Sequence, residues 1–164
     1  MFPSAETEGQ SMDAEHGRRR EGIALLILRV GLAYFIFLWA AHKLITPGQY
    51  QRLARHSDQV DLSLFQVYAS GGLQIALCVC VAVGIFRYFS YAGLAVMHLF
   101  TVTRRWEKFF DPFAVNDKGF PINRNVVIDL AILCAFIALI LLLHRGHYSL
   151  GGWLRKRGKG RWWL

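Results

Sequence analysis

The amino-acid sequence predicts an all-α fold, a membrane-embedded antiparallel four-helix bundle with disordered or interfacial tails. The chain has 164 residues, of which 54% are hydrophobic, and the apolar residues gather into long stretches. A helix rises about 1.5 Å per residue, so about 20 apolar residues cross the roughly 30 Å hydrocarbon core of a bilayer. Four stretches approach this length, and we expect each to be a transmembrane helix: residues 23–45, 67–86, 88–104 and 125–143.

The composition leaves room for one folded domain. Outside the four stretches only tails and three connections remain, which is too little for a separate soluble core. We therefore predict a polar N-terminal tail (1–22), a transmembrane domain (23–144) and a basic, tryptophan-rich C-terminal tail (145–164). The net charge of +8 gathers at the ends of the apolar stretches and in the tails. Anionic lipid headgroups account for it, so we expect the lipid bilayer as a partner and no nucleic acid.

The first part of the chain is expected to be a disordered tail that leads into an uncleaved helix. Residues 1–22 carry acidic residues and an arginine triplet without a periodic apolar pattern. The stretch 23–45 is longer than the roughly 7–15 apolar residues of a cleaved signal peptide, and Thr46-Pro47-Gly48 ends it. Residues 49–64 are mixed and polar, with apolar residues at helical spacing, which favours a short interfacial helix.

The later elements follow from turn signals and aromatic content. Gly71-Gly72 in the second stretch favours close approach of a neighbouring helix, and a very short turn at Arg87 predicts a tight antiparallel hairpin with the third stretch. The connection 105–123 is long and rich in aromatic residues, so we expect it to fold on the membrane surface or on partner helices. The tail that follows the last stretch combines basic residues with tryptophans, which is typical of segments at the membrane–water interface.

The distribution of basic residues gives an orientation. Ten lysines and arginines fall in the two tails and the Arg87 turn, against eight at the opposite end of the stretches. Cytoplasmic segments of membrane proteins carry the excess of positive charge. We therefore expect an integral protein of a bacterial inner membrane with both termini in the cytoplasm.

Polar residues inside the apolar stretches are the candidates for function, because charge in hydrocarbon is costly. His42, His98 and Asp129 all fall within about 10 Å of the same membrane face, as judged from the helical rise. Helical spacing also places polar residues of the first and third stretches on faces with small or polar neighbours. One predicted stripe holds Arg29, Ala33, Ile36, Ala40 and Lys43, and the other holds Tyr91, Ala95, His98, Thr101 and Arg105.

Structural interpretations of these residues stay open. Arg29 and Lys43 could extend toward the headgroups, and Trp39 could anchor the helix at the interface. His98 and Asp129 could form a hydrogen-bonded pair that fixes helix register, or a ligand or proton-handling site. We expect no haem b, because two histidines at similar depth are a weak signal for axial ligation. We expect no metal site either, because no carboxylate and histidine show ligand spacing along one helix.

Short segments in the apolar stretches form a recognisable pattern. Residues 29–33 are Arg-Val-Gly-Leu-Ala, and residues 37–44 are Phe-Leu-Trp-Ala-Ala-His-Lys-Leu. These resemble the first helix of the DoxX/DoxD-like membrane proteins, in which an arginine and a glycine open the helix and a tryptophan and a lysine close it. The segment Gly-Gly-Leu-Gln-Ile-Ala-Leu (71–77) is similar to the second helix of that family. The turn at Arg87 and the segment 124–130 are also similar to it.

The resemblance covers residues 23–143 and implies association with redox chemistry, as in the membrane subunit of a thiosulfate:quinone oxidoreductase. The first hypothesis is therefore an oxidoreductase membrane subunit that handles quinone. His42 and His98 would donate hydrogen bonds to the quinone carbonyls, and Asp129 would exchange protons. The sequence has no flavin or iron–sulfur motif, so electrons would come from a partner. The remaining candidates are Arg104 or Arg124, which would stabilise negative charge on the ring, and Trp39 or Trp106, which would pack against it.

The second hypothesis is a non-catalytic accessory subunit that packs against a larger membrane complex and stabilises it. The tails and the aromatic connection would then be the working parts, and the polar residues would be structural. A small-molecule transporter is a third alternative, which the lack of a detectable internal repeat disfavours.

Overall fold

The computed structural model describes residues 5–145 and 148–149, and over these residues the protein is all-α. It has five α-helices and no strand in this described part of the chain. Most of the predicted C-terminal tail therefore lies outside the described residues. The helices are α1 (Ala5–Ile45), α2 (Pro47–Asp58), α3 (Leu64–Val83), α4 (Arg87–Arg104) and α5 (Arg124–Leu141), with short 3₁₀ helices η1 (Trp106–Phe110) and η2 (Leu143–Arg145).

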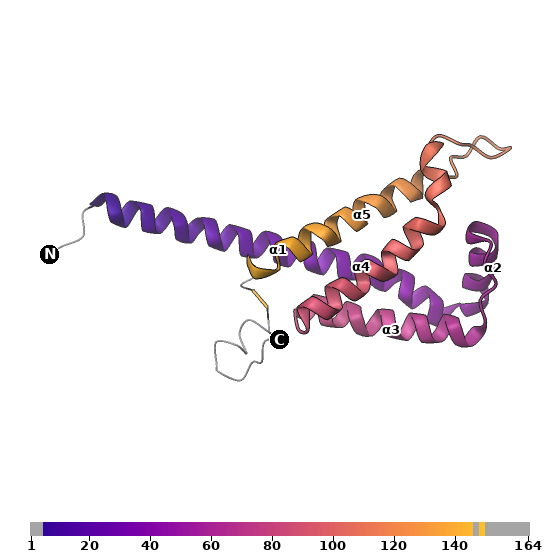
Figure 1. Ribbon diagram of the computed structural model, residues 1–164, viewed down its shortest axis with the longest axis horizontal. Coiled ribbons are helices and arrows are strands. Elements are labelled where there is room, and N and C mark those ends of the chain that lie inside the picture. Colours follow the sequence, from indigo (N-terminus) through magenta and orange to yellow (C-terminus); the bar gives the residue numbers. More distant parts are fainter. Residues whose placement is uncertain (1–4, 146–147, 150–164) are drawn as a thin grey trace.

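Helix α1 is much longer than the apolar stretch it contains. The prediction of a disordered tail over residues 1–22 is wrong from Ala5 onward, because the polar segment continues the helix and extends beyond the other helices (Figure 1). An existing helix is cheap to extend, since its costly nucleation has already occurred. The acidic residues also precede the arginines, as in Glu15 and Arg19 at i and i+4, which is the favourable order for helical ion pairs.

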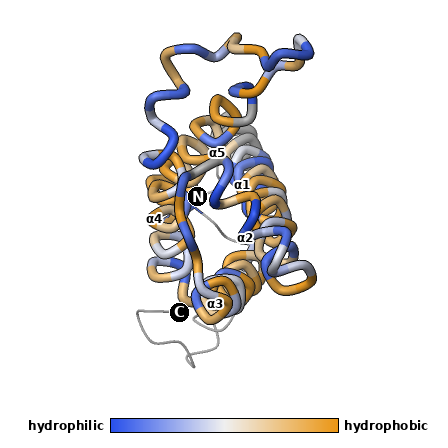
Figure 2. Tube along the Cα trace, turned by 90° about the vertical axis from the view of Figure 1, so that its right-hand side faces the viewer, coloured by the Kyte–Doolittle hydropathy of each residue, from blue (hydrophilic) through white to orange (hydrophobic). Residues whose placement is uncertain are grey.

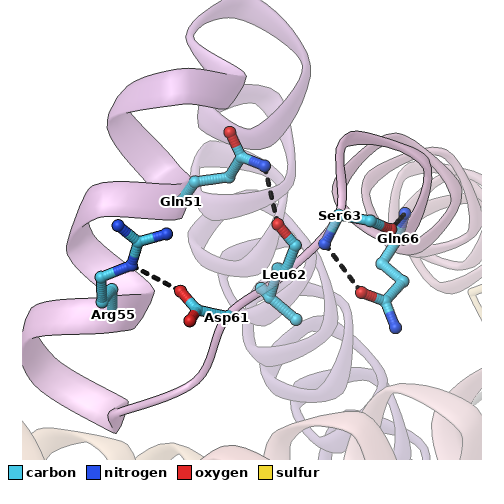
Figure 3. Close-up of polar contacts among 6 residues, drawn as sticks. All are labelled: Gln51, Arg55, Asp61, Leu62, Ser63 and Gln66. Atoms are coloured by element: carbon cyan, nitrogen blue, oxygen red, sulfur yellow. Dashed lines mark hydrogen bonds and ion pairs between the residues drawn. The ribbon is translucent and has the colours of Figure 1, made fainter.

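Helix α3 begins and ends three residues earlier than predicted. Ser63 and Gln66 form a capping box, in which the Ser63 hydroxyl accepts from the Gln66 amide and the Gln66 side chain accepts from the Ser63 amide (Figure 3). Gly84 ends the helix in the left-handed conformation with φ of 78°. The tight turn is therefore formed by residues 84–86, and Arg87 is the first residue of α4.

The connection between α4 and α5 has structure of its own. After η1, residues 114–122 fold back on themselves, with a single antiparallel bridge between Val115 and Pro121. The Asn116 side chain accepts hydrogen bonds from the amides of Lys118 and Phe120, which fixes the turn. This folded-back connection projects beyond the ends of α4 and α5 (Figure 1).

The four longer helices pack around a common axis. Helix α1 packs against α3 and α5, and α4 packs against the same two helices. Viewed from the α2 end, α1, α3, α4 and α5 follow one another around the centre, with apolar residues along their lengths (Figure 2). Helix α2 lies across the end of the α1–α3 pair and contacts both of these helices.

Each long helix buries one narrow stripe. Four of the five residues of the predicted α1 stripe, Arg29, Ala33, Ile36 and Ala40, are buried, and the fifth, Lys43, is half-buried. In α3 the buried positions recur every three or four residues, as expected for one face of a helix. The close approach predicted at Gly71-Gly72 occurs at Gly71, where an added Cβ would lie 2.9 Å from the Leu44 side chain; Gly72 faces open space.

Among the described residues, two helices are long and apolar enough to cross a membrane, the segment Ala14–Ile45 of α1 and the helix α3. Helix α5 contains a shorter apolar segment, Val126–Leu141. Helix α4 has 18 residues, and its basic and histidine side chains lower its apolar character.

Candidate functional site: a polar cavity beneath helix α2

A cavity of about 560 Å³ lies where α2 covers the ends of the long helices. We call it the polar cavity. Four of the seven predicted site residues line it, namely Trp39, His98, Arg104 and Asp129. The polar and charged side chains that line it are Lys43, Gln66, Ser70, Gln74, His98, Thr101, Arg104, Arg105 and Asp129.

His98 and Asp129 meet, but through the main chain of Asp129. The His98 Nε2 lies 2.8 Å from the Asp129 carbonyl oxygen, and because a carbonyl only accepts, Nε2 carries the proton. This bond joins α4 to the first turn and a half of α5. The buried imidazole therefore has only Nδ1 left for a ligand, an acceptor in the neutral ring and a donor in the protonated ring.

The carboxylate of Asp129 faces Arg105. Arg105 Nη1 lies 3.5 Å from Asp129 Oδ2, and both side chains are largely shielded from solvent. Arg105 caps the C-terminus of α4, so this ion pair is a second link between α4 and α5. The pair holds the carboxylate at the wall of the polar cavity, where its charge is compensated.

Lys43 reaches across from α1 to α3. Its Nζ donates to Gln74 Oε1 at 2.9 Å and lies 5.1 Å from the centre of the Tyr50 ring. The interpretation in which Lys43 extends alone toward the headgroups therefore does not describe its geometry. The short helix separation at Gly71 makes the contact possible, since an added Cβ there would lie 3.1 Å from Lys43 Cβ.

The polar cavity has an aromatic and apolar side as well. Trp39 lines it from α1, and Phe65 and Phe100 line it from α3 and α4. Arg104 lies over the Phe100 ring, with 4.9 Å from its guanidinium carbon to the ring centre. Ligand sites commonly combine such an apolar lining with a few polar groups.

Helix α2 and the segment after it form one wall. Tyr50, Leu53 and Leu62 line the polar cavity from this side. Gln51 Nε2 donates to the Leu62 carbonyl at 2.7 Å, and Arg55 pairs with Asp61, so α2 is tied to the segment that leads into α3 (Figure 3).

The other three predicted site residues lie elsewhere. His42 is absent from the described residues that line the polar cavity, and its ring packs edge-on against Tyr50 at 6.0 Å. His42 and Lys43 are consecutive residues, and consecutive side chains project about 100° apart around a helix, so the two point to different sides. Trp106 is exposed and packs edge-on against Phe110, and Arg124 is exposed at the start of α5.

Three residues that line the polar cavity were not among the site residues predicted from the sequence: Arg105, Gln74 and Lys43. Arg105 was assigned to the His98 stripe but not to the site, although its i+7 spacing from His98 was the signal. Gln74 could also have been identified as a candidate, because it is a polar residue within an apolar stretch. Lys43 was noted only as a residue that could reach the headgroups.

The opposite end of the helices holds two buried arginines, Arg29 and Arg87, which we call the arginine pair. Arg29 Nη2 donates to the Tyr148 carbonyl at 2.9 Å, and Arg87 Nη1 donates to the Leu143 carbonyl at 3.1 Å. Both line a void of only about 10 Å³, which is no larger than one water.

No group of three potential metal ligands occurs within the described part of the chain. Cys78, Cys80 and Cys134 are free thiols. Comparison of the chain with protein-family models, with curated proteins and with solved structures finds no match.

Proposed function

We propose that this chain is a DoxX-like integral membrane protein that binds quinone in the polar cavity, as the membrane subunit of a redox system. All four long helices would cross the bilayer. Helices α4 and α5 each have 18 residues and so extend about 27 Å, close to the thickness of the hydrocarbon core.

The exposed apolar surface supports the membrane location. Large apolar side chains such as Ile27, Leu73, Phe89 and Ile137 are exposed on the outer faces of the four long helices. In each of the two candidate spans, only 28% of the most apolar segment is buried within the protein. The core helix of a soluble protein would be mostly buried. Contiguous exposed apolar surface of this extent needs a partner, and lipid covers all sides of a helix bundle equally.

The observation that carries the quinone proposal is the polar cavity itself. Its volume of about 560 Å³ lies within the roughly 300–1,000 Å³ typical of small-molecule sites. A quinone needs polar partners for its two carbonyl oxygens and an apolar surface for its ring. Gln74 and His98 supply polar atoms from α3 and α4, and Trp39 supplies a flat apolar face.

Proton exchange in this proposal falls to His98 and Asp129. The carbonyl of Asp129 holds Nε2 of His98, which leaves Nδ1 to take or give a proton at the ligand. Arg105 orients the nearby carboxylate. Bound quinone would accept or release electrons, which a partner protein would supply or remove.

Equilibrium binding tests the proposal. Purified protein in lipid nanodiscs is titrated with decylubiquinone, and binding is followed by quenching of tryptophan fluorescence. We expect saturable binding that weakens about tenfold in His98→Ala, which corresponds to the loss of one good hydrogen bond. His42→Ala is the matched control, because that imidazole does not line the polar cavity.

Two results would contradict the proposal: binding that does not saturate, or equal affinity loss in the two histidine variants. Circular dichroism and elution in detergent verify that each variant keeps its helices.

The connection 105–123 favours a second candidate, the accessory subunit. Phe110 and Phe113 are 79% and 82% exposed, and Phe120 in the same connection is also exposed. Exposed aromatic clusters are typical of protein interfaces. Replacement of Phe110 and Phe113 by serine should then release a co-purifying membrane partner, whereas His98→Ala should retain it.

A further inference from the structure

We propose that the polar cavity selects amphiphiles whose head group carries a negative charge, and that Lys43 is the counter-ion of that head group. The inference rests on the proposed function only in using the same cavity. It concerns the charge of the ligand, which quinone binding by itself does not specify.

The partners of Lys43 are the first argument. Its ammonium group contacts an amide oxygen and an aromatic ring, both of them neutral. No carboxylate of the described residues lies within ion-pair distance of it. A half-buried ammonium without a compensating anion is costly, and an anionic ligand would offset that cost.

The charge of the whole lining points the same way. Of the residues that the structure describes, three cations line the polar cavity, Lys43, Arg104 and Arg105, but only one carboxylate does, that of Asp129. This carboxylate is engaged by Arg105. The lining therefore carries an excess of positive charge in a partly enclosed space, where Coulomb interactions are stronger than in water.

Gln74 adds a directional donor. Because Oε1 of its amide accepts from Lys43, its NH₂ group faces away from that bond and stays a donor. The residue is buried and lines the polar cavity, as Lys43 does, so the lining contains both an ammonium and a side-chain amide. A carboxylate or an ionised ring hydroxyl accepts hydrogen bonds from both kinds of donor.

The apolar side of the cavity argues that the ligand is an amphiphile. Phe65, Val96 and Phe100 line the polar cavity and are also well exposed on the outer faces of α3 and α4. The cavity therefore reaches the apolar surface of the helices, so a hydrocarbon tail can leave it over these apolar side chains. An inorganic anion would use none of this surface.

Matched pairs of probes test the inference. The first pair is a 2-hydroxy-3-alkyl-1,4-naphthoquinone, which is ionised at neutral pH, and its neutral 2-methoxy ether. The second pair is dodecanoate and its methyl ester. Each is titrated into protein in phosphatidylcholine nanodiscs by calorimetry, with empty nanodiscs as the correction for partitioning into lipid.

We expect the anionic member of at least one pair to bind about tenfold more tightly than its neutral partner. A single ion pair with Lys43 in a partly solvated site is strong enough for a difference of this size. Lys43→Gln should abolish this preference, because the affinity for the anionic member falls about tenfold toward that of the neutral member. Lys43→Arg should retain most of it. Arg55→Gln is the control, because Arg55 is an exposed cation paired with Asp61 outside the cavity lining.

Each outcome decides between the two proposals. Equal or tighter binding of both neutral members overturns the charge selection, and quinone binding then stands alone. A preference for dodecanoate with no binding of either naphthoquinone supports the charge selection and overturns the quinone function. A preference that survives in Lys43→Gln assigns the counter-ion to another residue and contradicts the role of Lys43. Absence of binding by all four probes overturns both.

Discussion

The two ends of the helices bury positive charge in different ways. The arginine pair donates to main-chain carbonyls at 2.9 and 3.1 Å, and the surrounding atoms leave a void of about 10 Å³. Lys43, at the other end, contacts a side-chain amide and a ring, and a cavity of about 560 Å³ lies beside it. Both ends bear the cost of desolvating a cation, but only one end has space for a ligand.

The difference gives a criterion for buried cations in an apolar helix bundle: whether the cation only bonds the protein itself or also faces a cavity. Arg29 and Arg87 hydrogen-bond carbonyls that lie near or beyond the end of α5, where main-chain oxygens have no helical partner. This use completes the fold. Lys43 and Arg105 also link helices, but they line a space that a small molecule can enter.

The largest effect on stability should come from Gly84→Ala, at the arginine pair. Gly84 has φ of 78°, and an added Cβ would lie 2.5 Å from Arg29 Nη1 and 2.7 Å from Ser149 Cβ. The left-handed conformation and the overlap should together lower the free energy of unfolding by about 2–3 kcal/mol. Unfolding by sodium dodecyl sulfate in mixed micelles, followed by circular dichroism, measures it.

Affinity for ligands of the polar cavity should not change in folded Gly84→Ala protein. A parallel loss of affinity would mean that the two ends are coupled, and the contrast between them would fail.

A smaller effect should follow Gly71→Ala, beside the polar cavity. The added Cβ would meet the Leu44 side chain at 2.9 Å and Lys43 Cβ at 3.1 Å, which forces α1 and α3 apart. Better helix propensity of alanine offsets part of the cost, so we expect a net loss of about 1 kcal/mol. Unlike Gly84→Ala, this variant should also weaken binding of the anionic probes, because it displaces Lys43.

Gly72→Ala is the matched control for both glycine variants. Nothing lies within 4 Å of its added Cβ, so stability should be unchanged or slightly increased. A loss as large as that of Gly71→Ala would show that backbone effects, and not helix contact, dominate.

The smallest effect should come from Arg55→Gln on α2. The Arg55–Asp61 pair is 73% and 75% exposed, and such pairs contribute less than about 0.5 kcal/mol. Thermal unfolding should shift by no more than the experimental error, and the shift should vanish in high salt. A clear destabilisation would instead make this pair part of what holds α2 over the polar cavity.

Much of the helical layout could be predicted from local patterns. The break after Ile45, the hairpin near Arg87 and the buried stripes of α1 and α4 all follow from turn residues and helical spacing. The boundaries of α3 were shifted because the capping box at Ser63 and the left-handed Gly84 override the apolar pattern. The helical start of α1 was missed because apolar periodicity does not detect a polar helix extended from an apolar one.

The candidate site was predicted in part. Depth along the helices correctly brought His98 and Asp129 together, but spacing alone does not say whether the imidazole meets the side chain or the carbonyl of Asp129. His42 lies at the predicted depth and packs against Tyr50 instead of lining the cavity. Depth along a helix does not fix the side to which a residue points. The rotation of the helix about its own axis decides this, because consecutive side chains are about 100° apart.

The sequence by itself determined the all-helical character, the single buried stripe on each long helix and the presence of polar side chains near one level, because these depend on local periodicity and composition. Only the tertiary structure decided that Lys43 meets Gln74, that Arg105 and not His98 pairs with the Asp129 carboxylate, and that a cavity lies among them. Helix rotation and close approach at Gly71 set these contacts, and both arise from packing between segments far apart in the chain.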